Sequence, residues 1–149
     1  MNQSSQNSQK SSSLPASLFD ASAIINLLIA QGSRIMDIVK GNWALDLTFY
    51  EVGNAVWKLN TITKKISTSE ADNLLSNLLN TVAGRINQIS SSEIDHLSTM
   101  RVAREEKLSF YDATYLSVAI ARNLLLVTDD GRLLNSAKKY VAVRTSSQL

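Results

Sequence analysis

Residues 107–134 constrain the fold more than any other part of the chain. After Ser109, the nearly uninterrupted apolar run 113–121 predicts a helix that is buried on most of its sides. Residues 124–128 form a Leu/Val run without alternation, which is typical of a parallel strand covered on both faces. A further helix is expected after Gly131. Helix, strand and helix in this order predict half of a doubly wound α/β fold.

The rest of the chain continues the alternation of strands and helices. Strands are expected at residues 14–20, 43–47 and 141–145, with a candidate edge strand at 86–89. Helices are expected at 23–31, 33–40, 48–65, 90–107 and 132–139, and another begins at a Ser67–Glu70 capping box. Because each connection returns the chain in the same sense, we predict a three-layer α/β/α fold. Its four- to five-stranded parallel sheet would carry helices on both faces.

The first residues differ in composition from everything that follows. Residues 1–13 are almost all Ser, Gln and Asn, with Lys10 as their single charged side chain. Such a segment buries too little apolar surface to offset the entropy of ordering it. We therefore expect a flexible tail at 1–13 and one folded domain at 14–149, which is long enough for a substantial core.

The content of metal-binding residues narrows the chemistry. The chain has no cysteine and one histidine, His96. Disulfides and thiolate metal sites are therefore excluded, and a histidine-based metal site or catalytic triad is disfavoured. His96 lies in a polar segment and is expected to be an ordinary, partly exposed helical residue. Any metal ion in this protein would need oxygen ligands.

Charge and hydropathy give an expectation of location. A formal net charge of +2 permits contact with nucleic acid. The lack of cysteine suits a reducing compartment, and the polar N-terminus does not resemble a signal peptide. The longest apolar run near it, 23–30, is interrupted by Asn26 and is too short to span a bilayer. We expect a cytoplasmic protein without membrane contact.

Four acids occupy equivalent local settings. Asp20 ends the first predicted strand, and Asp130 follows the strand at 124–128. Glu51 and Asp112 each lie in the first turn of a predicted helix. In a parallel sheet, strand ends and helix starts share one edge, which is where ligands bind in open α/β sheets. The four carboxylates can therefore converge there.

Each of these acids also has a purely structural interpretation. Residues 48–51 and 109–112 both fit Ser/Thr-x-x-acid, the pattern of a helix capping box. Asp20 fits a helix N-cap, and residues 129–131 fit an ordinary turn. Acids near the start of a helix are also stabilised by its dipole, by about 0.3 to 1 kcal/mol each.

The joint pattern favours a metal site over a set of caps. Two carboxylates about 5 Å apart, at an effective dielectric constant near 20, repel each other by about 3 kcal/mol. Helix caps gain nothing from that repulsion, whereas a divalent cation removes it. Mg²⁺ and Mn²⁺ prefer oxygen ligands and bridge to phosphate oxygens, so the pattern indicates metal-assisted phosphodiester hydrolysis.

Four short segments resemble the motifs of a known family. They are Phe-Asp-Ala-Ser at 19–22, Thr-Phe-Tyr-Glu-Val-Gly-Asn-Ala at 48–55, Ser-Phe-Tyr-Asp-Ala at 109–113 and Leu-Val-Thr-Asp-Asp at 126–130. In order and spacing they resemble the four motifs of PIN-domain ribonucleases, most closely the VapC-type toxins of prokaryotic toxin–antitoxin pairs. The resemblance implies a PIN fold, one or two Mg²⁺ or Mn²⁺ ions and endonucleolytic cleavage of RNA. It also implies a homodimer and a cognate antitoxin.

The same resemblance assigns residues to the site. The implied catalytic and metal-binding acids are Asp20, Glu51, Asp112 and Asp130, and the supporting polar residues are Ser22 and Thr128. The Thr-x-Asp spacing of the fourth motif favours Asp130, but its neighbour Asp129 remains an alternative. Both supporting residues are equally interpretable as capping or turn hydroxyls.

Substrate and partner contacts are predicted on fewer residues. Arg132 is the best candidate for RNA contact because it lies next to the rim. Tyr50 and Tyr111 each precede a predicted ligand; packing in the core or at the rim is favoured over base stacking. The helix at 74–82 carries more apolar residues than one covered face requires, which indicates a homodimer interface.

Several functions remain open at this level. A housekeeping RNA-processing nuclease and a toxin share the same motifs, and a non-catalytic binding domain can keep the fold. A receiver-like signalling domain would need paired acids after the first strand and a lysine after the last. Residues 20–22 and 143–145 supply neither.

Overall fold

Five parallel strands form the centre of the molecule. The computed structural model describes residues 15–149, and the predicted tail at 1–13 lies outside this range. The sheet has the order β3-β2-β1-β4-β5, and every neighbouring pair is parallel. The strands are β1 (Ser17–Phe19), β2 (Trp43–Leu45), β3 (Asn87–Ile89), β4 (Leu125–Val127) and β5 (Val143–Arg144). The predicted parallel sheet and its edge strand at 86–89 are confirmed.

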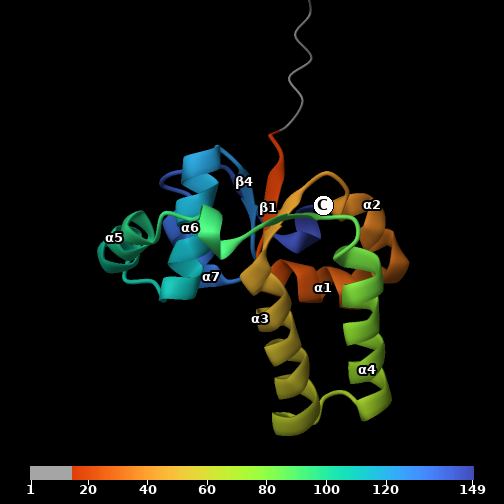
Figure 1. Ribbon diagram of the computed structural model, residues 1–149. Coiled ribbons are helices and arrows are strands. Elements are labelled where there is room, and N and C mark those ends of the chain that lie inside the picture. Colours follow the sequence, from red (N-terminus) through yellow and green to blue (C-terminus); the bar gives the residue numbers. More distant parts are fainter. Residues whose placement is uncertain (1–14) are drawn as a thin grey trace, which may run out of the picture.

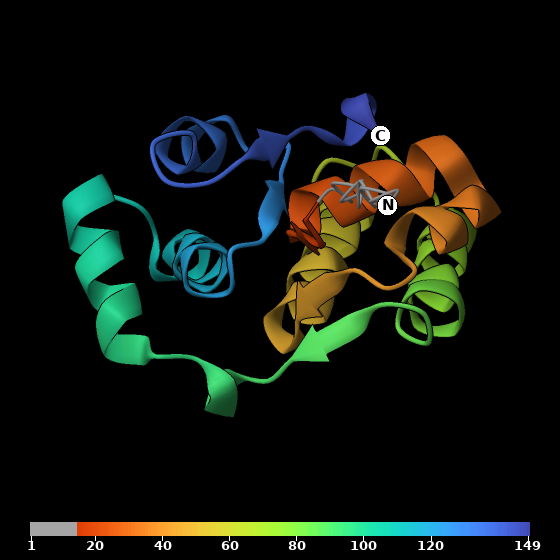
Figure 2. The same cartoon turned by 90° about the horizontal axis from the view of Figure 1, so that it is seen from above.

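Helices cover both faces of the sheet (Figures 1 and 2). One side carries α1 (Ala21–Gln31), α2 (Ile35–Val39), α3 (Asp46–Trp57) and α4 (Thr68–Asn77). The other side carries α5 (His96–Glu106), α6 (Phe110–Arg122) and α7 (Gly131–Ala137). The shorter helical turns are η1 (Gly32–Arg34), η2 (Lys58–Ile62), η3 (Leu78–Val82), η4 (Ser91–Glu93) and η5 (Ser146–Gln148). This is the predicted three-layer α/β/α architecture.

The strands bury side chains on both faces, which separates two cores. Phe19 and Val127 face the core shared with α1 and α3. Leu18 and Leu126 face the core shared with α6 and α7. Because successive side chains of a strand point to opposite faces, a strand covered twice must be apolar throughout. The unalternating run at 124–128 is therefore a central strand, as predicted.

The central helix α6 begins and ends where its sequence indicates. Ser109 is the N-cap and accepts a hydrogen bond from the backbone N–H of Asp112. Residues 113–119 are all buried. Asn123 ends the helix in the left-handed conformation, with φ 51°, and its N–H bonds to the last carbonyl groups. The helix therefore holds a fixed position against the sheet.

The start of α3 differs from the prediction. The helix begins at Asp46, and Leu45 is its N-cap residue. Thr48 is the third helical residue, and its buried hydroxyl accepts a hydrogen bond of 3.1 Å from the backbone N–H of Leu45. The predicted capping box at 48–51 is therefore wrong. The side chain that bonds back to the N-cap is that of Thr48, not that of Glu51. Glu51 lies further along, in the second turn of the helix.

The segment after β3 also differs. Ser90 and Glu93 do form a capping box, but it starts only the short turn η4. The helix α5 begins at His96, where Asp95 caps it by accepting bonds from the N–H groups of Leu97 and Ser98. The predicted single helix at 90–107 is wrong because the backbone is extended at Ile94 and Asp95, where a second cap starts a new helix.

A two-helix arm extends beyond the sheet. In Figure 1, α3 and α4 run side by side below the strands and are joined at their far end by a short loop. Ser67 and Glu70 form the predicted capping box of α4. Along the apolar stripe at 74–82, Leu78 and Val82 are buried, whereas Leu79 is 63% exposed. Most of the stripe is thus covered by the molecule's own core.

The first helical segment is also apolar because many of its side chains pack in the core. Ala21–Val39 is long and apolar enough to cross a membrane by length and composition alone. This segment is longer than the run at 23–30, which was predicted to be too short to span a bilayer. The apolar side chains of α1 lie in the core beneath β1 and β4, which accounts for their composition.

Candidate active site

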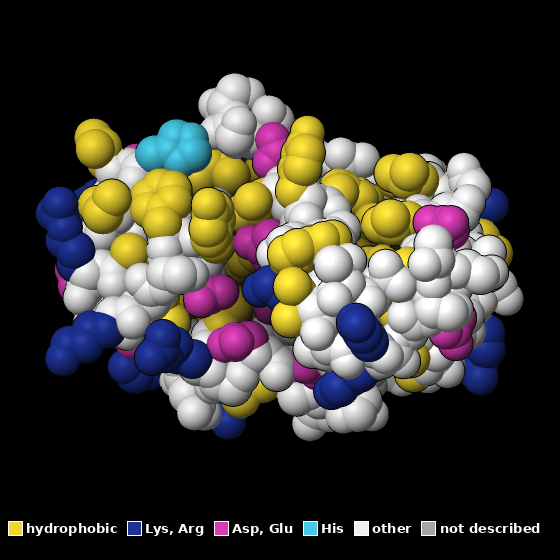
Figure 3. Space-filling view, turned by 90° about the horizontal axis from the view of Figure 1, so that it is seen from below, with side chains coloured by type: hydrophobic (Ala, Val, Ile, Leu, Met, Phe, Trp, Pro, Cys, Tyr) yellow, Lys and Arg dark blue, Asp and Glu magenta, His cyan; other side chains and the backbone are white. Residues whose placement is uncertain are grey.

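Acidic side chains surround a hollow at the carboxyl edge of the sheet. Figure 3 views this edge, and acidic groups line the depression in the middle of the face. Asp20 follows β1, Glu51 projects from α3, Asp112 from α6, and Asp130 follows β4. Their charges act on one another: Asp112 and Asp20 raise the pKa of Glu51, and Asp130 raises that of Asp112. The tertiary structure therefore brings the four predicted acids together.

Asp20 is the most enclosed of these acids. Its side chain caps α1 by accepting a hydrogen bond of 2.9 Å from the N–H of Ala23. The hydroxyl of Ser22 lies 2.8 and 2.9 Å from its two oxygens, and the hydroxyl of Thr128 lies 2.5 Å from one of them. Burial nevertheless outweighs these donors and raises the pKa of Asp20 to about 6. The carboxylate is held in one orientation by both predicted polar residues.

Glu51 has a different set of neighbours. Because α3 begins at Asp46, Glu51 takes no part in capping the helix. The hydroxyl of Tyr115, from inside α6, donates a hydrogen bond of 3.4 Å to its carboxylate and lies 2.9 Å from the hydroxyl of Thr48. Burial, followed by the charges of Asp112 and Asp20, raises the pKa of Glu51 to about 7. Tyr115 was missed by sequence reasoning, which assigned its apolar surroundings to the core alone.

Asp112 takes part in the capping of α6 and also lies among the acids of the rim. Its backbone N–H donates to the hydroxyl of Ser109 at 3.1 Å, and that hydroxyl donates back to its carboxylate at 2.8 Å. Burial raises the pKa of Asp112, and Asp130 adds to the effect. Arg132 acts in the opposite sense, which places this arginine close to the acids, next to the rim as the sequence indicates.

The two adjacent aspartates after β4 have different surroundings. Asp129 accepts a hydrogen bond of 2.7 Å from the side chain of Asn26 and one of 2.8 Å from the N–H of Ser146. Each of its oxygens is therefore engaged in joining α1 to the segment after β5. Asp130 accepts from the N–H of Leu133 with one oxygen, as the N-cap of α7. Its second oxygen faces no such donor among residues 15–149, which favours Asp130 over Asp129 as the fourth acid.

A cleft of about 530 Å³ opens between α1, α3 and α6. Its lining includes Ser22, Glu51, Asn54, Lys58 and Asp112. Among residues 15–149, the two ion pairs are Arg122–Glu93 and Lys139–Glu106, and neither involves a rim acid. The carboxylates thus face one another without a paired protein cation.

The donor set fits a hard divalent cation. As the side chains stand, no three acidic or histidine groups within residues 15–149 are gathered tightly enough to enclose an ion directly. Mg²⁺ commonly takes only one or two carboxylates and completes its octahedron with water and substrate phosphate. Four neighbouring carboxylates, of which Asp20, Glu51 and Asp112 have raised pKa values, match that chemistry, since none of them is paired with a lysine or arginine in the part of the chain that the structure describes.

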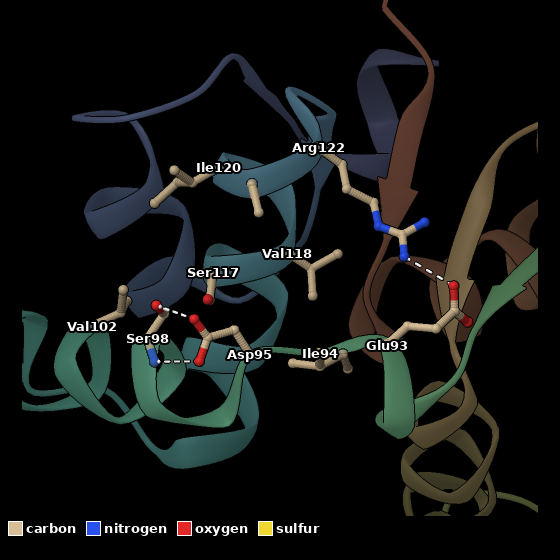
Figure 4. A pocket seen from close by; sticks show the side chains of 10 residues that line it. Glu93, Ile94, Asp95, Ser98, Val102, Ser117, Val118, Ile120 and Arg122 are labelled. Carbon is tan, nitrogen blue, oxygen red and sulfur yellow. Dashed lines mark hydrogen bonds and ion pairs between the residues drawn. The ribbon is translucent and has the colours of Figure 1, made fainter.

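A second hollow lies apart from the acids, between η4, α5 and α6 (Figure 4). It has a volume of about 230 Å³. Arg122 pairs with Glu93 at 3.0 Å across one side, and Asp95 is engaged with Ser98 in capping α5. Its charged groups already have structural partners, so it offers no comparable chemistry.

Comparison with known proteins agrees with this fold. Residues 17–139 match the family model of the PIN domain. The chain therefore belongs to the PIN-domain family of nucleases. Exonuclease VapC9 of Pyrobaculum aerophilum is 36% identical over 101 residues, which are 68% of this chain and 71% of that protein. Within the family, the chain is thus one of the VapC-type proteins.

Solved structures extend the comparison to the whole domain. PAE2754 from Pyrobaculum aerophilum has a TM-score of 0.72 at 30% identity and covers 90% of this chain and 85% of its own. FitAcB from Neisseria gonorrhoeae has a TM-score of 0.57 at 18% identity, with coverage of 89% and 99%. The second similarity concerns the fold alone.

Residues predicted at the margins of the site are also placed. His96 is exposed at the start of α5, as expected, and its ring stacks on Phe110 outside the acid cleft. Tyr50 and Tyr111 are 80% and 59% exposed. Of the predicted packing in the core or at the rim, the core is therefore wrong for both tyrosines, and Tyr111 lies at the rim, where it lines the acid cleft.

Proposed function

We propose that this protein is a Mg²⁺- or Mn²⁺-dependent endoribonuclease that hydrolyses phosphodiester bonds of single-stranded RNA. The observation that carries the proposal is the acid rim, in which burial, followed by the charges of neighbouring carboxylates, raises the pKa values of Asp20, Glu51 and Asp112. A cation bound among these carboxylates would relieve that repulsion. The family membership supports nuclease chemistry.

The residues have distinct roles in this proposal. Asp20, Glu51 and Asp112 would hold the cation, one or two of them directly and the rest through bound water, with Asp130 completing the set. When bound, such an ion supplies Lewis-acid activation of water and offsets charge on the phosphate. Ser22 and Thr128 fix the orientation of Asp20, and Tyr115 that of Glu51. Lys58 at the cleft and Arg132 beside Asp112 supply positive charge for the RNA backbone.

Cleavage of circular RNA tests both the metal and the mode of attack. Purified protein should linearise a circular single-stranded RNA in Mg²⁺ or Mn²⁺, and EDTA should abolish the reaction. The relative VapC9 is named an exonuclease. If a linear RNA is degraded while the circle stays intact, the protein attacks chain ends and the endonucleolytic part of the proposal fails. Undiminished cutting in EDTA would remove the metal mechanism.

The biological role proposed is that of a toxin with a cognate antitoxin, acting in the cytoplasm. Its support is the similarity to VapC9 together with the VapC-type motifs. Expression should arrest growth, and expression of Asp112→Asn at the same level should not. Growth unaffected by the active protein favours the alternative of a housekeeping RNA-processing nuclease. Absence of both cleavage and metal binding favours a non-catalytic domain of the same fold.

We also propose a homodimer, though on fewer residues than the sequence indicated. Leu78 and Val82 are buried within the chain, so Leu79 on the arm and Trp57 on α3 remain as exposed apolar side chains. Light scattering at micromolar concentration should give twice the chain mass. A monomer mass would contradict the proposal.

A further inference from the structure

We propose that an aromatic pocket beside the acid cleft binds an unpaired nucleobase of the RNA substrate. The pocket has a volume of about 290 Å³, and its walls include Tyr50, Phe110, Tyr111 and His96. Three of the nine Phe, Trp and Tyr residues of the chain, together with its single histidine, thus line one hollow. This inference rests on the proposed nuclease function and names the part of the substrate that is recognised.

The pocket is held open by contacts between distant segments. The carboxylate of Asp46, on α3, accepts a hydrogen bond of 2.9 Å from the N–H of Ser91 on η4. The ring of His96 lies 3.0 Å from the carbonyl oxygen of Ser91 and stacks on Phe110, with centroids 6.2 Å apart and planes inclined by 24°. One wall is therefore a preformed aromatic stack, which lowers the ordering cost of binding a flat ring.

The opposite wall consists of aromatic surface that the fold itself does not use. Tyr50 is 80% exposed and Tyr111 is 59% exposed. Within residues 15–149, neither hydroxyl makes a hydrogen bond to another protein group. Exposed aromatic side chains at a concave site are typical of stacking surfaces for single-stranded nucleic acid.

Because the pocket lies beside the acids, the base that it binds would be close to the scissile bond. Tyr50 directly precedes Glu51, and Tyr111 directly precedes Asp112. Tyr111 lines both the pocket and the acid cleft, so the two hollows adjoin at this residue. In Figure 3 the histidine and the hydrophobic groups around it lie on the same face as the acid-lined depression. RNA bound at the cleft therefore passes the pocket.

The charge of the lining selects the base rather than the phosphate. No lysine or arginine lines the pocket, and its one charged residue is Asp46. A phosphate would be repelled by this carboxylate. Each oxygen of Asp46 already accepts one backbone N–H, from Leu47 or Ser91, and keeps a second lone pair to which the amino edge of a nucleobase can donate. A base paired within a duplex keeps that edge occupied, so the pocket requires an unpaired base.

Binding of a fluorescent RNA decamer tests the pocket independently of catalysis. The fluorescent base 2-aminopurine occupies the central positions of the decamer. Binding is measured in Mg²⁺ with the Glu51→Gln variant as the parent protein, because this variant is expected not to cut the RNA. Adding Tyr50→Leu or Tyr111→Leu should weaken binding by roughly 5- to 150-fold, the range that corresponds to loss of one base-stacking contact. Tyr50→Phe and Tyr111→Phe keep the ring and should bind like the parent.

Tyr140→Leu is the matched control. Tyr140 is also an exposed tyrosine, but it precedes β5 and so lies at the amino edge of the sheet, away from the pocket. This variant should bind RNA normally. Annealing a complementary strand to the decamer should weaken its binding to Glu51→Gln. It should also abolish the difference in affinity between Glu51→Gln and the variants that carry Tyr50→Leu or Tyr111→Leu in addition.

The outcomes separate this proposal from its alternatives. Unchanged affinity of both Leu variants overturns it. A fall from dimer to monomer mass in those variants assigns the surface to a second copy of the chain and also overturns it. If the protein without any substitution fails to cut RNA while binding still depends on the two tyrosine rings, the proposed nuclease function fails and the base pocket stands.

Discussion

Tyr115 donates a hydrogen bond of 3.4 Å to the carboxylate of Glu51 from within the buried run of α6. The two residues are 64 positions apart in the chain. The bond lowers the pKa of Glu51 against the larger effect of burial. An interior tyrosine thereby influences both the orientation and the charge of a rim acid.

Removing that donor should change the pH dependence of the reaction. In Tyr115→Phe, the pKa of Glu51 should rise above its value of about 7, because the lowering bond is lost. The acidic limb of the pH–rate profile should move to higher pH, and the free energy of unfolding should fall by about 1 kcal/mol as Thr48 loses its partner. An unmoved acidic limb in Tyr115→Phe would show that the bond does not act on Glu51.

Glu51→Gln separates metal binding from stability. Since Glu51 does not cap α3, loss of its charge should leave metal-free stability unchanged or raise it by relieving repulsion from Asp112 and Asp20. Mn²⁺ affinity, measured by calorimetry, and RNA cleavage should both fall steeply. Parental cleavage by this variant would exclude Glu51 from the metal site.

Thr48→Ala is the counterpart on the same helix. The hydroxyl of Thr48 is buried and accepts from the N–H of Leu45, so its loss should cost about 1 to 3 kcal/mol. Metal affinity should be largely retained. If Thr48→Ala and Glu51→Gln lose metal affinity equally, the effect of Glu51→Gln comes from a disturbed α3 and not from the loss of a metal-binding carboxylate.

Metal-free stability should fall as the solution approaches neutral pH. The pKa of Asp20 is raised from 3.8 to about 6 and that of Glu51 from 4.5 to about 7. A raised folded-state pKa favours the protonated folded protein, so its stabilisation is present below the unfolded-state value and is lost as pH rises through the folded-state value. For Asp20 alone this corresponds to about 3 kcal/mol.

Thermal unfolding across that range, with and without Mn²⁺, measures the effect. The midpoint without metal should decrease between about pH 4 and pH 7. Mn²⁺ should raise it more at neutral than at acidic pH, and Asp20→Asn should flatten the metal-free curve. A midpoint that rises from acidic to neutral pH without metal would contradict the pKa directions.

The neighbouring aspartates should separate in a paired comparison. Asp130→Asn keeps a good N-cap for α7 while removing the charge, so stability should be unchanged and metal affinity should fall. Asp129→Ala breaks the bonds to Asn26 and Ser146 and should cost about 1 to 3 kcal/mol while sparing the metal. Chemical unfolding and calorimetry report the two quantities. Reversed results would make Asp129 the fourth acid.

The sequence by itself determined most of the elements and the edge at which the acids meet. The buried helix α6, the central strand β4 and the caps Ser109 and Asp20 are local patterns, set by side-chain periodicity and by bonds between residues two or three positions apart. Parallel connectivity then directs strand ends to one edge. These features need no knowledge of distant partners.

Tertiary structure alone decided how the shared polar groups are used. Two segments fit the same capping pattern, yet Ser109 caps α6 while Thr48 lies inside α3 and meets Tyr115. Likewise, the contact between Asp129 and Asn26 joins residues 103 positions apart. The aromatic pocket also draws its walls from α3, η4, α5 and α6. A polar group binds whichever donor packing brings near, and that choice becomes defined only when the chain is folded.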